Sequence, residues 1–309
     1  MKRLPAIQII GVLGAVSLLP GLWLNAAGDD FTIRNEVRLV LLDVSVQNRD
    51  GNLITGLSKD DFTVLENGQP QAISVFDSGD APVTMGILVD ESGSMVPKRD
   101  QVLIAAQALI AESNHQDEVF VLNFNDSVKR GLPEGILFSD SIPQLHAALY
   151  RERPAGKTAL YDAVADGLKQ LEDGRRSRKT LVVISDGGDN ASLHKRIETV
   201  GRVERSAATV YAIGLYEEGD SEADPGVLRQ LAKISGGRAW FPKAVDGVPG
   251  VCHRIAREIR TRYTVGYVPR EDKKAAALRH VQVKASSPGQ GRLNVLTRTS
   301  YRYDELPAK

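Results

Sequence analysis

Cysteine is nearly absent from the sequence, with Cys252 the one example among 309 residues. No disulfide can therefore form within the chain, and an apolar core has to hold the fold. Cys252 recurs with Val248, Ile255 and Ile259 at helical spacing, which predicts a small buried side chain, with a reactive thiol as the less favoured alternative. The five histidines show no paired metal-ligand spacing, so a zinc site is not expected.

An excess of charge of either sign is absent too, since 39 Lys and Arg residues balance 39 Asp and Glu residues. Such a chain has no overall field to attract nucleic acid or an anionic membrane. Arg175, Arg176, Arg178 and Lys179 form a local basic run, but no aromatic side chains that could stack on bases are interleaved with it. We expect this run to be a solvated loop, and no nucleic-acid partner.

A long apolar stretch occurs at the N-terminus, where Lys2 and Arg3 precede an uncharged segment from 4 to 27 that ends in small residues. This order predicts a secretory signal within residues 1–28. The segment is long enough to span a bilayer, so an uncleaved anchor over 4–27 is the alternative, weakened by Pro20 and several glycines. The protein is therefore expected to be exported, either periplasmic or secreted.

The sequence pattern of residues 30–80 predicts β structure. Apolar and polar residues alternate from Val40 to Gln47, as in a half-buried strand. The turn Asn67-Gly68 between 63–66 and 72–76 predicts a hairpin. After residue 261, alternation at 263–268, 281–285 and 295–301 predicts further strands. We expect residues 262–305 to pair with residues 30–80, forming one small β domain that is split in the sequence.

Between these segments, residues 81–261 alternate short apolar runs with amphipathic stretches. Such alternation indicates crossover units on a parallel sheet covered by helices on both faces. The predicted fold class is α/β, a doubly wound, mostly parallel six-stranded sheet of Rossmann-like type. The predicted strands are 85–89, 119–124, 181–185, 209–214 and 238–241, with an antiparallel edge strand within 128–136; the helices are 102–111, 142–150, 159–171, 193–206, 227–234 and about 248–260.

Three loops of this domain carry oxygen side chains to one end of the sheet. Asp90, Ser92 and Ser94 follow the strand 85–89, Asp186 follows 181–185, and Thr158 precedes a helix. In open α/β sheets, ligands bind beyond the carboxyl ends of the strands, where the strand order reverses. Oxygen ligands suit a hard cation, with Mg²⁺ the best fit and Mn²⁺ or Ca²⁺ as alternatives.

The charge of the metal's ligands decides what such a site does. If the hydroxyls bind the ion directly and the carboxylates act through water, the cation stays electrophilic and takes a carboxylate from outside. If both carboxylates bind directly, the charge is already neutralised and an acidic ligand gains little.

Asp90-x-Ser92-x-Ser94, Thr158 in Gly-Lys-Thr-Ala-Leu-Tyr-Asp-Ala, and Asp186 in Ile-Ser-Asp-Gly-Gly-Asp-Asn resemble the metal-ion-dependent adhesion site (MIDAS) of von Willebrand factor type A (VWA) domains. The resemblance covers roughly residues 81–245, and the flanking segments are similar to a group of exported bacterial proteins that carry this domain. It implies that the two serines and the threonine reach the metal, that the aspartates act partly through water, and that a ligand carboxylate completes the octahedron.

The resemblance therefore implies a metal-dependent binding or adhesion module of the cell envelope, not an enzyme, with an acidic protein or peptide as partner. Lys157 departs from the glycine common at this position in similar bacterial sequences. Its ammonium group could weaken metal binding or attract the acidic ligand. Asp162 and Asp189 are candidates for supporting roles behind the metal ligands, and Asp189 could orient a metal-bound water.

Two other functions stay open. A metal-dependent hydrolase would need a general base, and although His194 could approach Asp186, the G-x-S-x-G signature and a phosphate-binding loop are missing. The domain could instead be a metal-stabilised structural part of an envelope complex. Each motif by itself also has a purely structural explanation that needs no metal, because Ser94 could cap a helix and Asp186 could close an ordinary loop.

Overall fold

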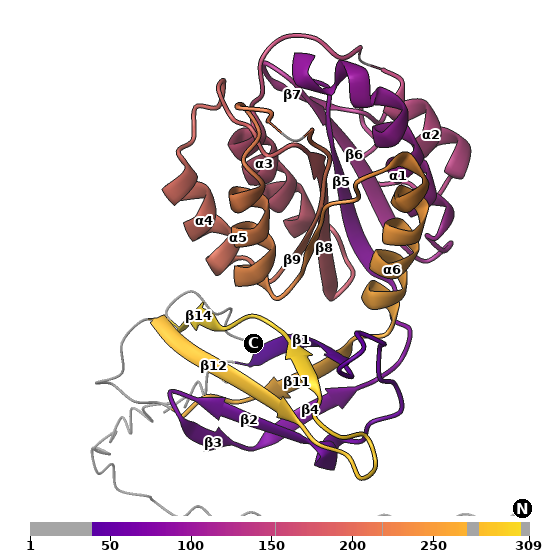
Figure 1. Ribbon diagram of the computed structural model, residues 1–309. Coiled ribbons are helices and arrows are strands. Elements are labelled where there is room, and N and C mark those ends of the chain that lie inside the picture. The colour runs from indigo at the N-terminus through magenta and orange to yellow at the C-terminus, as the bar shows by residue number, and fades with distance from the viewer. Residues whose placement is uncertain (1–38, 152, 218, 271–277, 304–309) are drawn as a thin grey trace, which may run out of the picture. The chain divides into compact units, whose positions relative to one another are not determined.

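The computed structural model describes residues 39–151, 153–217, 219–270 and 278–303 (Figure 1). The expected signal or anchor within residues 1–28 lies outside these ranges. In the described part of the chain, no helix is both long and apolar enough to cross a membrane.

A six-stranded, mostly parallel sheet forms the centre of the middle segment, in the order β10-β9-β8-β5-β6-β7. The edge strand β7 is antiparallel to β6, and the other neighbours are parallel. Every residue of β5, β6 and β9 is buried, as expected for a parallel sheet covered on both faces. The predicted fold class is thereby confirmed. The strands are β5 (Val83–Asp90), β6 (Glu118–Phe124), β7 (Val128–Arg130), β8 (Arg178–Ser185), β9 (Thr209–Gly214) and β10 (Ala239–Trp240).

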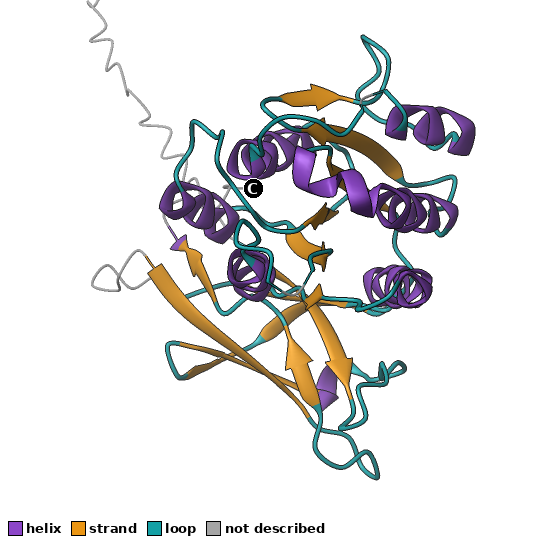
Figure 2. Cartoon of the chain, turned by 45° about the horizontal axis from the view of Figure 1, so that its top comes forward, coloured by secondary structure: helices purple, strands orange, loops and turns teal. Residues whose placement is uncertain are grey.

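Six helices cover the two faces of this sheet (Figures 1 and 2). One face carries α1 (Arg99–Ala111), α2 (Ile142–Leu149) and α6 (Val248–Arg260), and the other carries α3 (Leu160–Glu172), α4 (Arg196–Arg205) and α5 (Pro225–Ser235). Their apolar sides form one continuous core with the strands. Cys252 belongs to it, fully buried on α6 with its sulfur 3.4 Å from the Ala105 carbonyl oxygen, as the helical spacing predicts.

The order of the strands places a switch point between β5 and β8. From β5 the chain passes through α1 to β6 on one side, whereas from β8 it passes through α4 to β9 on the other. The two strands are in register up to the pair Val89 and Ile184. Their carboxyl ends therefore lie side by side at the point where ligands bind in open α/β sheets.

Strands from before and after this segment pair with one another in two four-stranded sheets. The first has the order β13-β1-β11-β4 and the second β14-β12-β2-β3, and every pairing in them is antiparallel. A second apolar core lies between them. The strands are β1 (Val40–Gln47), β2 (Phe62–Glu66), β3 (Gln69–Gln71), β4 (Ile73–Asp77), β11 (Tyr263–Tyr267), β12 (Leu278–Ala285), β13 (Asn294–Leu296) and β14 (Ser300–Arg302). Among the described residues, three short 3₁₀ helices complete the elements: η1 (Lys59–Asp61), η2 (Gly93–Lys98) and η3 (Val245–Gly247).

A buried polar cluster around Glu66 ties these β strands together. One carboxylate oxygen of Glu66 accepts hydrogen bonds from the hydroxyls of Tyr267, at 2.8 Å, and Tyr301, at 2.6 Å. The other accepts from the Arg279 guanidinium at 2.6 Å. All four side chains are buried, so this cluster links β2 to three strands more than 200 positions further along the chain.

Two strand predictions are wrong in detail. The turn at Asn67 (φ 47°) and Gly68 (φ 81°) forms as expected, but it joins β2 to the short β3, and after Ala72 the chain leaves for the other sheet, where β4 pairs with β11. The predicted strand 295–301 is likewise divided between the two sheets as β13 and β14. In both cases the partner strand is distant in sequence, so local alternation carries no sign of the break.

The basic run is also different from the prediction. Arg178 does not lie in a solvated loop but opens β8 and is buried, and its guanidinium donates to the Arg262 carbonyl oxygen at 2.8 Å. Arg175 remains exposed and pairs with Glu118 at 3.0 Å. Arg175 and Arg178, two of the four cations in this run, thus each have a defined partner within the protein.

Candidate metal centre

Asp90 ends β5 and fixes the loop that follows it. The carboxylate is fully buried; one oxygen accepts the Ser92 backbone N–H at 2.9 Å, and the other accepts the Ser185 hydroxyl at 2.6 Å. Asp90 therefore holds both its own loop and the last residue of the neighbouring strand β8. Its negative charge is directed at the switch point.

The two serines of this loop lie beside Asp186. The Ser92 and Ser94 hydroxyl oxygens are 3.1 Å apart, and the Ser94 hydroxyl donates to Asp186 Oδ2 at 2.6 Å. Asp186 Oδ1 accepts the Gly188 N–H at 2.9 Å, which fixes the carboxylate from behind. Neighbouring ligands of an octahedral Mg²⁺, each about 2.1 Å from the ion, are about 3.0 Å apart. The hydroxyl pair therefore has the spacing of two adjacent ligands.

The third loop is joined to the first by main-chain hydrogen bonds. Ala155 N donates to the Glu91 carbonyl at 2.8 Å, and Gly93 N donates to the Gly156 carbonyl at 3.0 Å. Gly156 has φ +79°, and a side chain there would overlap the Asp126 carboxylate, so the tight path of this loop depends on glycine. These contacts set the loop of Thr158 against the loop of the two serines.

Thr158 itself is buried and is anchored by Asn190. The Thr158 N–H donates to Asn190 Oδ1 at 2.8 Å, and the Thr158 carbonyl accepts the backbone N–H groups of Asn190 and Ala191. Because Asn190 follows Asp186 in the loop after β8, the second and third loops are bonded as well. The structure thus brings all three predicted loops to one place.

Burial and like charge perturb Asp90. Burial, as the largest cause, and the nearby charge of Asp186 raise the pKa of Asp90 to about 6, although hydrogen bonds from Ser185 and Ser92 act in the opposite direction. Two carboxylates enclosed together carry a charge that a cation would offset. In the described part of the chain, no group of three or more His, Cys, Asp or Glu is placed to hold a metal. The donors here are hydroxyls with two carboxylates, which fits a hard cation such as Mg²⁺ and not zinc held by nitrogen or sulfur.

Sequence reasoning missed Lys98, the last residue of η2. Its side chain is 5% exposed, and its Nζ lies 3.2 Å from Asp220 Oδ2 and 3.9 Å from Asp186 Oδ2. A buried ammonium group therefore contacts the carboxylate that also accepts the Ser94 hydroxyl. No local signal marks this lysine, because Asp220 is 122 positions away.

The other three predicted residues take less central places. Asp162 accepts the backbone N–H groups of Leu193 and His194, each at 2.9 Å, so it shapes the loop that follows Asp186. Asp189 lies in that loop and is half-buried, and burial raises its pKa. The side chain of Lys157 is exposed, and its backbone N–H donates to Asp126 at 3.1 Å.

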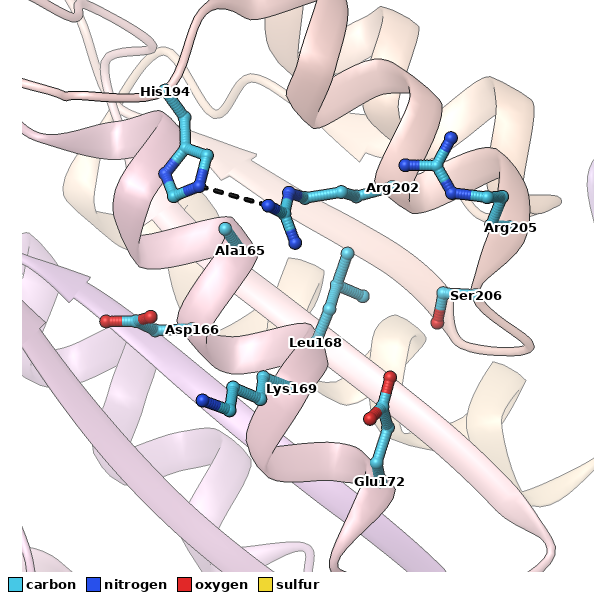
Figure 3. Close-up of a pocket in the computed structure, with 9 residues that line it drawn as sticks. All are labelled: Ala165, Asp166, Leu168, Lys169, Glu172, His194, Arg202, Arg205 and Ser206. Atoms are coloured by element: carbon cyan, nitrogen blue, oxygen red, sulfur yellow. Dashed lines mark hydrogen bonds between the residues drawn. The ribbon is translucent and has the colours of Figure 1, made fainter.

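His194 does not contact Asp186 in the structure. Its Nδ1 lies 2.6 Å from Asp162, and Arg202 lies 3.2 Å from its Nε2 (Figure 3). Because a guanidinium can only donate, Nε2 accepts and Nδ1 carries the hydrogen that points to Asp162. Both ring nitrogens are engaged away from the three loops.

Comparison with known proteins assigns the family. The model of the von Willebrand factor type A domain family matches residues 85–248. A von Willebrand factor type A protein from Catenulispora acidiphila is similar in structure, with a TM-score of 0.52 and 14% identity over 88% of this chain and 76% of that chain. Proximal thread matrix protein 1 from the mussel byssus, in a structure with a zinc-occupied MIDAS motif, has a TM-score of 0.51 and 12% identity over 64% of this chain and 50% of that chain.

At these identities the solved structures are evidence for the fold alone, and no curated protein matches the sequence. The family match covers more than half of the chain, and it runs from within β5 to the start of α6, so it includes the six-stranded sheet and five of its six helices. The chain belongs to the von Willebrand factor type A domain family.

Proposed function

We propose that Asp90, Ser92, Ser94, Thr158 and Asp186 hold one divalent cation at the switch point. Mg²⁺ is the expected ion, with Mn²⁺ and Ca²⁺ as alternatives. The observation that carries this proposal is the 3.1 Å spacing of the Ser92 and Ser94 hydroxyls beside Asp186. The zinc-occupied MIDAS motif of the mussel protein, which shares the fold, is consistent with a divalent ion at this edge.

The hydrogen bonds support a neutral set of direct ligands. The Ser94 hydroxyl gives its hydrogen to Asp186, so in the contact between the two hydroxyls Ser92 is the donor. Each hydroxyl has one hydrogen and two lone pairs, so each keeps a lone pair that can face a cation. The carboxylates then supply negative charge from behind the hydroxyls, and the bound ion keeps its attraction for a further anion.

We infer that this further anion is a carboxylate of an acidic protein or peptide partner. VWA domains are modules that often mediate metal-dependent protein binding, and the donor arrangement above suits that role. The engagement of His194 with Asp162 and Arg202 leaves Asp186 without a neighbouring imidazole base, which favours binding over hydrolysis.

The remaining parts of the proposal concern the rest of the chain. We propose that residues 30–80 and 262–305 form one β domain interrupted by the VWA domain at 81–261, and that residues 1–28 direct export to the cell envelope. Mass measurement of the mature protein from expressing cells tests the export step. Cleavage near residues 26–28 is expected, and recovery of the full-length chain in the soluble cytosolic fraction would refute it.

Binding of a fluorescein-labelled Gly/Ser peptide with one aspartate tests the central function. Fluorescence polarisation should rise with the protein in Mg²⁺ and return to baseline in EDTA. Asp90→Ala should abolish the signal, because it removes the carboxylate that fixes both Ser92 and Ser185. Asp166→Ala, a loss of an exposed aspartate on α3, is the matched control and should bind as the wild type does. Equal binding in Mg²⁺ and EDTA would contradict the metal-bridged mechanism.

A further inference from the structure

A cavity adjoins the metal centre through Lys98, at the carboxyl edge of the sheet. It has a volume of about 720 Å³. Its lining includes Lys98, Tyr216, Glu217, Arg229, Phe241 and Lys243. These residues, called the basic pocket below, come from η2, from the segment after β9, from α5 and from the segment after β10.

The basic pocket has a fixed aromatic wall. The guanidinium carbon of Arg229 lies 4.2 Å from the centre of the Phe241 ring, and the Tyr216 ring meets the same ring edge-on at 5.7 Å. Gly214 at the end of β9 makes room for Phe241, since a side chain there would overlap the ring. Arg229 is therefore held in place by stacking, with its charge still available.

Positive charge predominates in the described lining. Arg229 and Lys243 are exposed and form no ion pair with any residue that the structure describes, whereas Lys98 pairs with Asp220 and Asp186. Glu217 is the carboxylate of the described lining that opposes them, and it is exposed. An anion entering the pocket would meet two cations that form no ion pair with a described carboxylate.

Lys98 is shared between this pocket and the metal centre. Lys98 is one of the residues that line the pocket, and its ammonium group lies 3.9 Å from Asp186 Oδ2, the oxygen that accepts the Ser94 hydroxyl. One extended ligand segment could therefore occupy both places without a gap. The metal centre and the basic pocket together therefore suit a ligand with two negative groups a short distance apart.

We propose that the basic pocket binds a second carboxylate of the acidic ligand whose first carboxylate binds the metal. The second group is an aspartate or glutamate side chain, close in sequence to the first, and Arg229 and Lys243 are its partners. The proposal rests on the function proposed above. It adds a rule of selectivity, namely that paired acidic residues bind more tightly than single ones.

A set of labelled peptides tests this rule by fluorescence polarisation on the full chain in Mg²⁺. One peptide carries a single aspartate in a Gly/Ser sequence, and a series adds a glutamate one to four positions further on. The best two-acid peptide should bind about tenfold more tightly than the single-acid peptide, the value of one charge-assisted contact. Arg229→Gln with Lys243→Gln should remove this gain and leave binding of the single-acid peptide within about twofold.

The matched control removes the same charge from another groove. Lys169→Gln with Arg205→Gln neutralises two exposed cations of the groove between α3 and α4 shown in Figure 3, and it should keep the tenfold preference. Loss of the preference in this control would show a nonspecific charge effect and overturn the proposal.

The outcomes separate the pocket from the metal site. Mg²⁺-dependent binding of the single-acid peptide with no gain from any second acid overturns the basic pocket and leaves the metal-bridged function standing. A gain that survives Arg229→Gln with Lys243→Gln overturns it as well. Failure of every peptide to bind in Mg²⁺ overturns both proposals.

Discussion

Replacing Lys98 by methionine should tighten the binding of Mg²⁺. The ammonium group lies 3.9 Å from Asp186, so it competes with a metal ion for the same carboxylate. Two unit charges 4 Å apart interact by about 4 kcal/mol at an effective dielectric constant of about 20. Asp220, which is closer at 3.2 Å, offsets most of this. A net effect on the order of 1–2 kcal/mol remains, equivalent to a gain in affinity of about 5- to 30-fold.

Replacing Asp220, the ion-pair partner of Lys98, should change the affinity for Mg²⁺ in the opposite direction. Asp220→Asn removes the carboxylate that holds Lys98 and directs the ammonium group toward Asp186, so the affinity for Mg²⁺ should fall by a similar factor. Titration calorimetry of both variants and the wild type measures the effect, with thermal melting in EDTA as the check on folding. Variants that shift the affinity in the same direction, or a Lys98→Met protein within twofold of wild type, would refute the electrostatic reasoning.

Three further predictions concern stability and accessibility. Glu66→Ala leaves the buried Arg279 without its carboxylate and should lower the free energy of unfolding in urea by about 3–5 kcal/mol; a loss below about 1 kcal/mol would contradict the role given to this cluster. Burial would raise the pKa of Glu118, but hydrogen bonds from Arg175 and Thr84 lower it from 4.5 to about 2. The ionised Glu118 side chain therefore contributes fully to the free energy of unfolding above about pH 4.5, and this contribution is lost as the pH falls toward 2. Over that range the stability of Glu118→Gln should depend less steeply on pH than that of the wild type, and equal slopes would contradict the prediction. Cys252 is buried, which raises its thiol pKa to about 12; it should react with a thiol reagent at pH 8 only after unfolding, and rapid labelling of the native protein would show the helix packing to be wrong.

Local patterns predicted the parts of the fold that local chemistry determines. The strands β5, β6, β8 and β9 are apolar runs because both faces of a parallel sheet are buried, and such runs are visible in a single sequence. The three loops of the candidate site were found for a similar reason. Carboxyl ends of parallel strands share one edge, so Asp90 and Asp186 had to lie close together once their strands were neighbours.

Features that depend on distant partners were not predictable in this way. The ion pair of Lys98 with Asp220, the burial of Arg178 and the division of 295–301 between two sheets each depend on a residue far away in the chain. From sequence alone, a charged residue at the start of a strand is assigned to a loop unless its buried hydrogen-bond acceptor is known. The basic pocket was invisible for the same reason, because four separate segments contribute its lining.

Calorimetric titration of the full-length protein with MgCl₂ tests the central claim most directly. One ion per chain should bind with a dissociation constant of about a millimolar or tighter, and Ser94→Ala should weaken it by at least about tenfold because one direct ligand is lost. Asp166→Ala should bind as tightly as the wild type. Absence of any heat of binding for Mg²⁺, Mn²⁺ and Ca²⁺ at millimolar concentrations, on a protein shown to be folded, would contradict the account.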